Sequence, residues 1–137
     1  METVFATLLD IHSIIRWVVV IVAAAAALKF VLGWTRRTPW QAADRGVMSA
    51  FTGLVDLNVT LGIIMLLSLG IQSGEWPMYR IEHAGTMLLA VIVAHASARW
   101  RKKGDDATQF RNSLIVVAVV MLLIVGGVAS LPGGWSR

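Results

Sequence analysis

The sequence predicts an all-α protein, an integral membrane bundle of four helices that run up, down, up and down. The chain is 57% hydrophobic and 15% charged, whereas about a quarter of the residues of a soluble domain are charged. Its apolar residues form four stretches, each close to the ~20 residues that a membrane helix needs. The connections are short, so sequential helices are expected to be antiparallel neighbours in one domain over residues 1–137.

The first two helices are expected at about 11–34 and 47–71. The first fifteen residues contain Glu2 and Asp10 but no Lys or Arg, and a signal peptide would begin with a basic region. We therefore expect the first apolar segment to remain as a membrane helix. The second carries a single charge, that of Asp56.

The third and fourth helices are expected at about 79–100 and 113–131. The third contains Glu82, His83 and His95, and the fourth contains no charged residue. In lipid, segments of this length are helical because each backbone N–H and C=O needs a partner within the segment.

The basic residues lie mainly in two connections that share one side of the membrane. The first and third connections hold eight of the twelve Lys and Arg residues, namely Arg36, Arg37, Arg45, Arg99, Arg101, Lys102, Lys103 and Arg111. The positive-inside rule places this side in the cytoplasm. We therefore expect a multi-pass protein of the bacterial cytoplasmic (inner) membrane with both termini outside. Topology accounts for the net charge of +4, so no nucleic-acid partner is expected.

Several kinds of chemistry are excluded by what the sequence lacks. The chain has no cysteine, which rules out disulfides, cysteine-ligated iron–sulfur clusters and covalently attached c-type haem. It also has no His-Glu-x-x-His zinc motif and no phosphate-binding loop. We predict no catalytic residue, and an electron carrier or accessory subunit is favoured over an independent enzyme.

All three histidines lie in the expected membrane helices, where ionisable side chains are costly and therefore indicate a functional site. His12 and Arg16 are four residues apart and share a helix face. The third helix starts from the same side of the membrane, which brings Glu82 and His83 to a similar depth. If the first and third helices face each other across the bundle, these side chains are expected in one outer-leaflet layer.

Two histidines on facing helices are suited to a b-type haem. The imidazoles of His12 and His83 would be its axial metal ligands, and the guanidinium of Arg16 would pair with a propionate. Met87 is a further soft neighbour or ligand. A chlorophyll-type pigment or a quinone would use the same groups. In a purely structural alternative, His12 reaches interfacial water and Glu82 pairs with Arg16 or Arg80.

His95 is expected to be separate from this pair. It is twelve residues from His83, or ~18 Å along the helix axis, so the two cannot bind one iron. Its simplest role is structural, and the alternative is cofactor binding, at a second haem or a quinone. Asp56 should reach a similar depth, where it would stay protonated or bond to His95 or Lys29.

Five segments of the chain carry a resemblance to known proteins; they are Leu9–Trp17, Ala42–Arg45, Phe51–Asn58, Ile81–His83 with Met87, and Ala94–His95 with the basic run that follows. They resemble a family of small four-helix bacterial membrane proteins of the Chloroflexi and Bacteroidetes type, often labelled cytochrome b-like. The resemblance covers nearly the whole chain. It implies the four-helix fold and a haem role for His12, His83 and also His95.

The leading hypothesis is a membrane-embedded haem b protein with a bis-histidine site near the outer face. It would pass electrons between a quinone pool and the subunits of a larger membrane redox complex. One alternative is a cofactor-free accessory subunit that packs against a respiratory or photosynthetic complex. Another is a pigment- or quinone-binding subunit.

Overall fold

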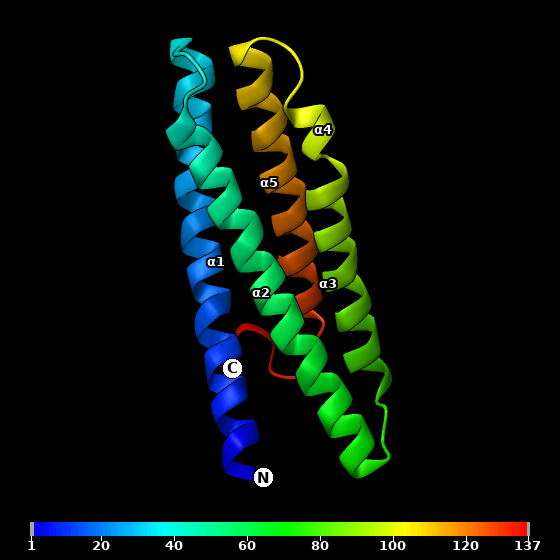
Figure 1. Cartoon of the computed structure of the whole chain (residues 1–137). Coiled ribbons are helices and arrows are strands. Elements are labelled where there is room, and N and C mark those ends of the chain that lie inside the picture. The colour runs from blue at the N-terminus through cyan, green and yellow to red at the C-terminus, as the bar shows by residue number, and fades with distance from the viewer. Residues whose placement is uncertain (1, 137) are drawn as a thin grey trace.

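The protein is an all-α bundle, as the sequence predicts. The structure is a computed structural model and describes residues 2–136. Four long helices run up, down, up and down (Figure 1), and the full set of helical elements is α1 (Glu2–Arg36), α2 (Ala42–Ser73), α3 (Met78–Ala96), α4 (Ala98–Arg101), α5 (Asp106–Ala129) and the 3₁₀ turn η1 (Gly134–Ser136). The described part of the chain contains no strand.

Three of the helices begin earlier than their apolar stretches suggest. α1 begins by Glu2 rather than near residue 11, α2 at Ala42 and α5 at Asp106. At the start of α2 a capping box satisfies backbone donors, with the Gln41 N–H donating to Asp44 Oδ2 over 2.8 Å. Such caps let a helix continue into polar sequence, which a prediction based on apolar length does not capture.

The third predicted helix is interrupted near its C-terminal end. α3 ends at Ala96, and the one-turn helix α4 follows Ser97. The Ser97 hydroxyl donates to the Ala94 carbonyl over 3.0 Å. A serine that bonds to the preceding turn competes with the backbone ladder and favours a helix end, so the continuous helix expected over 79–100 was wrong in this detail.

The helices pack in the order that short connections impose. α1 contacts α2 and α5, and α3 also contacts α2 and α5, so α1 and α3 are diagonal across the core. Small residues line the centre, with Ala26 and Ala90 fully buried. Nearer α4 the core is aromatic, and Gly33 of α1 lies directly against the buried ring of Phe110 on α5.

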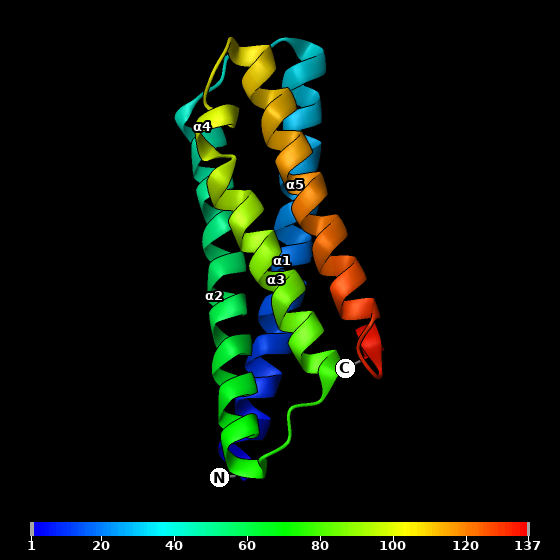
Figure 2. The same cartoon turned by 90° about the vertical axis from the view of Figure 1, so that its right-hand side faces the viewer.

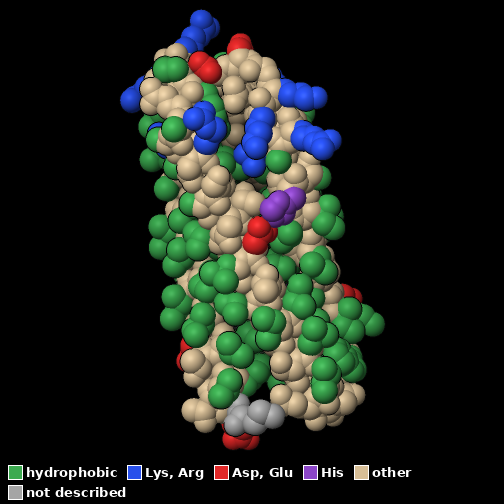
Figure 3. Space-filling view, viewed as in Figure 1, with side chains coloured by type: hydrophobic (Ala, Val, Ile, Leu, Met, Phe, Trp, Pro, Cys, Tyr) green, Lys and Arg blue, Asp and Glu red, His purple; other side chains and the backbone are tan. Residues whose placement is uncertain are grey.

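The outer surface of the bundle is largely apolar, and charge is concentrated at one end. Lys and Arg side chains gather at the end that carries α4, which we call the basic end (Figure 3). Within residues 2–136, four helices are long and apolar enough to cross a membrane, with windows of mean hydropathy from 1.3 to 2.6. These properties are those of a multi-pass membrane protein.

The opposite end of the bundle is uneven. The first turns of α1 and the last turns of α2 extend beyond the end of α5 (Figures 1 and 2). The segment after α5 turns back toward α1, where Trp135 packs on Trp17 with ring centroids 5.5 Å apart. This end therefore has a core that the four helices alone do not fill.

Candidate functional site

A cavity of about 200 Å³ lies within the bundle, in the half away from the basic end. Residues of α1, α2, α3 and α5 and of the segment after α5 line it. Apolar side chains form most of its wall. Its polar side chains include those of His12, Arg16, Asn58, Arg80 and His83. We refer to it as the bundle cavity.

His12 is positioned by a backbone carbonyl on the neighbouring helix. Its ring is half-buried, and Nδ1 lies 3.0 Å from the carbonyl oxygen of Asn58 on α2. A helix carbonyl points toward the residue four positions later, which here is Gly62. A Cβ added to Gly62 would lie 3.1 Å from His12 Cε1. The missing side chain therefore opens the path by which the imidazole reaches this carbonyl.

His83 is held in a matching way on the other side of the core. Its Nδ1 lies 2.9 Å from the carbonyl oxygen of Gly127 on α5. The carbonyls in the last turn of a helix lack the usual backbone donor; the N–H of Leu131 bonds instead to Val128. The Ser130 hydroxyl also donates to the Gly127 oxygen, over 2.8 Å. His83 thus completes a helix end that would otherwise be under-satisfied.

His12 and His83 make the same kind of hydrogen bond, from Nδ1 to a backbone carbonyl. A backbone carbonyl only accepts a hydrogen bond, so each Nδ1 carries a proton, and in the neutral ring each Nε2 carries the lone pair. No hydrogen bond within residues 2–136 uses either Nε2. The separations along the chain are also similar, 46 residues from His12 to Asn58 and 44 from His83 to Gly127. The α1–α2 and α3–α5 pairs therefore present equivalent imidazoles to one cavity.

Arg16 lies beside this pair, one turn after His12. It is buried, with 6% of its surface exposed. Its guanidinium carbon lies 5.2 Å from the ring centroid of Trp135 and 5.7 Å from that of Trp17. These cation–π distances are short enough to stabilise the charge. The return of the chain after α5 thus helps to fix Arg16 at the cavity wall.

Glu82 is adjacent to His83 on α3, but its side chain faces out of the bundle. The residue is exposed, and neither of the two ion pairs between described residues includes it. The structural alternative that pairs Glu82 with Arg16 or Arg80 was therefore wrong. Adjacent residues of a helix point about 100° apart, so His83 faces the core while Glu82 faces outward. Arg80 instead lines the bundle cavity and lies over the Tyr79 ring at 5.6 Å.

Two contributors to the cavity were missed at the sequence level. The side-chain Oδ1 of Asn58 is buried and has no hydrogen-bond partner among residues 2–136. Gly62 has no side chain, and the space that this leaves accommodates the His12 ring. The spacing of Asn58 and Gly62, four residues apart on a helix facing His12, is the signal that was available.

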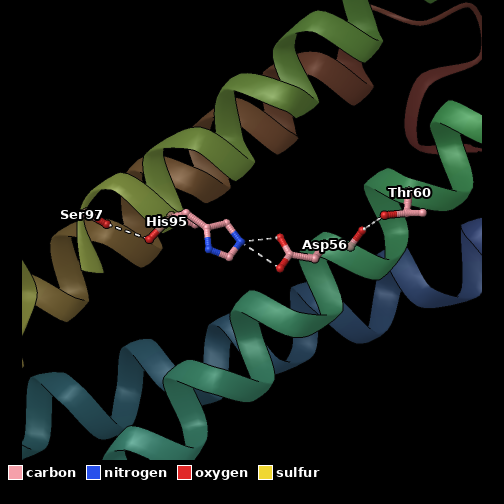
Figure 4. Close-up of polar contacts among 5 residues, drawn as sticks. Asp56, Thr60, His95 and Ser97 are labelled. Atoms are coloured by element: carbon pink, nitrogen blue, oxygen red, sulfur yellow. Dashed lines mark hydrogen bonds and ion pairs between the residues drawn. The ribbon is translucent and has the colours of Figure 1, made fainter. Parts of the chain in front are cut away.

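His95 lies outside the cavity, as expected, and forms an ion pair. Its Nε2 is 2.9 Å from Asp56 Oδ2 and 3.0 Å from Oδ1 (Figure 4). This selects one of the two partners predicted for Asp56. The other, Lys29, pairs with Asp44 at 3.2 Å. Asp56 is also less buried than expected, with 38% of its side chain exposed.

Comparison with protein-family models, with curated proteins and with solved structures finds no match. We therefore infer the function from the geometry of the bundle cavity.

Proposed function

We propose that the protein is a membrane-embedded electron carrier that binds haem b in the bundle cavity, with His12 and His83 as axial ligands. The proposal rests mainly on the hydrogen bonds that orient the two imidazoles. Each Nδ1 bonds to a backbone carbonyl, which leaves each Nε2 lone pair available to a metal. Metal-binding histidines are commonly oriented by such a bond to the second ring nitrogen.

The number of protein ligands favours haem over a bare metal ion. The described residues include no group of three or more His, Cys, Asp or Glu side chains that could hold an ion. Structural and catalytic zinc sites use three or four protein ligands. Two imidazoles suffice only where another molecule supplies the remaining donors, as the four nitrogens of a porphyrin do. Haem iron is held in this way by one or two axial side chains.

The other polar groups of the cavity fit the periphery of a haem. A guanidinium has five N–H donors in a fixed fork, so Arg16 can bind a propionate while it keeps its contacts with the two tryptophans. The buried Asn58 Oδ1 has no partner within residues 2–136 and would accept a hydrogen bond from a bound group or water. The cavity of about 200 Å³ is smaller than the ~300–1,000 Å³ of most ligand pockets. Haem would therefore enter by parting the apolar side chains of its wall.

The chain's own contribution would be to hold and tune the group. When bound, haem would supply one-electron chemistry at this site. The apolar wall excludes water, and the carbonyl bonds of His12 and His83 fix their tautomer and raise the basicity of the ligating nitrogens. The Arg16 charge nearby would favour the more electron-rich state of the site.

The distribution of basic residues supports a particular orientation of this carrier in the membrane. By the positive-inside rule the basic end faces the cytoplasm of a bacterium, and the bundle cavity lies toward the outer face of the cytoplasmic membrane. The chain has almost no mass outside its helices, so we infer that its electron donor and acceptor are a quinone pool and the subunits of a larger membrane redox complex. The resemblance to cytochrome b-like four-helix proteins supports the same proposal.

Haem titration of the purified apoprotein tests the proposal. We expect saturation at one haem per chain and a low-spin six-coordinate spectrum. His12→Ala and His83→Ala should each lose that spectrum. His95→Ala is the matched control, because His95 lies outside the cavity, and it should bind as the wild type does.

Two outcomes would contradict the proposal. A wild-type protein that takes up no haem from a saturating solution would leave the cofactor-free accessory subunit as the better hypothesis. Equal loss of binding in His95→Ala and His12→Ala would show that the cavity is not the binding site.

A further inference from the structure

The Asp56–His95 pair is a polar site on the outside of the bundle. Asp56 comes from α2 and His95 from α3, and the imidazole Nε2 meets both carboxylate oxygens (Figure 4). The pair bridges the two helices (Figure 4), and His95 lies in the last turn of α3, next to α4 and the basic end. The side chains are 56% and 38% exposed for His95 and Asp56 respectively.

The surroundings of the pair are those of a lipid-facing surface. Ile92, one turn before His95, is 59% exposed, and Leu57, next to Asp56, is 48% exposed. Polar groups in such surroundings are costly unless a partner completes their hydrogen bonds. Gly53 lies on the same face as Asp56, and a Cβ built there meets nothing within 4 Å. The surface beside the carboxylate is therefore open.

The free nitrogen of His95 defines what the pair would bind. Both hydrogen-bond contacts of the ring use Nε2, and no hydrogen bond within the described part of the chain uses Nδ1. The Asp56 carboxylate accepts a hydrogen bond from Nε2 and so orients the imidazole with Nδ1 outside the pair. With neutral imidazole, Nδ1 accepts a hydrogen bond; with imidazolium, it donates one.

We propose that Asp56 and His95 form a binding site for the head group of a lipid-phase quinol or quinone. A quinol presents a hydroxyl donor and a quinone presents a carbonyl acceptor, so the imidazole serves both forms of one ligand by holding or releasing a proton. The flat ring would lie over Gly53, and the isoprenoid tail would run along the apolar surface. A phosphate head group fits less well because it would meet the Asp56 carboxylate.

The Asp56–His95 site extends the proposed function, but its binding of a ligand does not depend on the bundle cavity. Its part in electron transfer rests on haem binding in the bundle cavity, where His83 is twelve residues or ~18 Å along α3 from His95. The binding of the head group depends only on α2 and α3. The two proposals can therefore fail separately.

Nitrogen-15 NMR of histidine-labelled protein in detergent micelles tests the site, with decylubiquinol as the probe under reducing conditions. We expect a saturable shift of the His95 ring signals, which the His95→Gln spectrum identifies. Asp56→Asn should weaken binding at least tenfold, because the amide can also donate to Nε2 and so no longer keeps Nδ1 as the acceptor that the quinol hydroxyl needs. Glu82→Gln removes an exposed carboxylate of α3 outside the pair and should bind as wild type.

Two control experiments distinguish binding at this site from binding in the bundle cavity and from ordinary lipid contact. The double variant His12→Ala/His83→Ala should still show the His95 shift, whatever the fate of haem. Decanol, which has a hydroxyl on a similar tail but no ring, should give no saturable shift. The proposal is overturned if decylubiquinol leaves the His95 signals unchanged, if decanol acts equally, or if Asp56→Asn binds as tightly as wild type.

Discussion

Gly62 is the residue that sets the position of the His12 ring. It stands one turn after Asn58, and the imidazole packs over its backbone on the way to the Asn58 carbonyl. The sequence identified His12, His83 and Arg16 because buried ionisable side chains are rare in membrane helices. It did not identify the two carbonyls that orient the rings, since a backbone acceptor has no signature in the sequence.

Gly62→Ala should loosen the bundle cavity's hold on haem without unfolding the protein. The new methyl group would lie 3.1 Å from His12 Cε1, so the ring has to shift by a few tenths of an ångström. An off-rotamer side chain costs about 0.5–1.5 kcal/mol, and 1.4 kcal/mol is tenfold in affinity. We expect haem affinity to fall roughly two- to tenfold in a titration of the apoprotein.

Gly53→Ala is the control for this change. It lies on the same helix, and its Cβ meets nothing within 4 Å. Haem affinity should stay at the wild-type value. Equal losses in the two variants would mean that Gly62 matters for the helix and not for His12.

The close contact between helices α1 and α5 depends on Gly33. A Cβ there would lie 2.4 Å from two atoms of the Phe110 ring, and that ring is 1% exposed. Overpacking of a core costs about 1–3 kcal/mol, while alanine gains up to about 1 kcal/mol over glycine in a helix. We expect Gly33→Ala to lower the free energy of unfolding by up to about 2 kcal/mol in a denaturant titration.

Gly46→Ala provides the comparison on α2, because its Cβ meets nothing within 4 Å. It should be neutral or slightly stabilising. A Gly33→Ala protein as stable as Gly46→Ala would contradict the close approach of α1 and α5.

The start of α5 should depend on pH through its cap. Asp105 accepts a hydrogen bond from the Thr108 N–H over 2.9 Å. Hydrogen bonds from Thr108, from its side chain first and then its backbone, hold the pKa of Asp105 below its ordinary value of 3.8. A lowered carboxyl pKa stabilises the folded state above the unfolded value and loses that effect as the pH falls through the folded value.

Amide hydrogen exchange in the first turn of α5 checks this dependence. Protection should be constant above about pH 4 and should weaken below it. Asp105→Ala should lack the transition, whereas Asp106→Ala, which leaves the cap in place, should retain it. A transition that persists in Asp105→Ala would exclude the cap as its cause.

The exact boundaries of the helices could not be predicted from hydrophobic periodicity or from the length of the apolar stretches. The four long helices and their order were predicted because each apolar stretch is long enough to span lipid. The early starts of α2 and α5 depend on the polar caps at Gln41 and Asp105. The break at Ser97 depends on a local side-chain bond, to which hydrophobicity is insensitive.

The whole molecule is a bundle with charge at one end and a cavity toward the other. The diagonal placement of α1 and α3 was predictable from short connections alone, and it brings His12 and His83 to one cavity. The outward direction of Glu82 was not anticipated, because the prediction used depth along the helix and not rotation about its axis.

Orientation in the membrane can be tested with single cysteines, since the chain has none. We expect Glu75→Cys, in the connection between α2 and α3, to react with a membrane-impermeant maleimide added to intact cells. Thr38→Cys and Lys103→Cys, at the basic end, should react only after the membrane is opened. The reverse pattern would place the basic end outside and contradict the positive-inside assignment.

Near-infrared magnetic circular dichroism of the oxidised, haem-loaded protein is the most direct test of the central claim, because its charge-transfer band reports both axial ligands. The account predicts a bis-imidazole band in the wild type and in His95→Ala, and its loss in His12→Ala and in His83→Ala. A histidine–methionine band, which would implicate Met87, or a bis-imidazole band that survives either cavity substitution would contradict it.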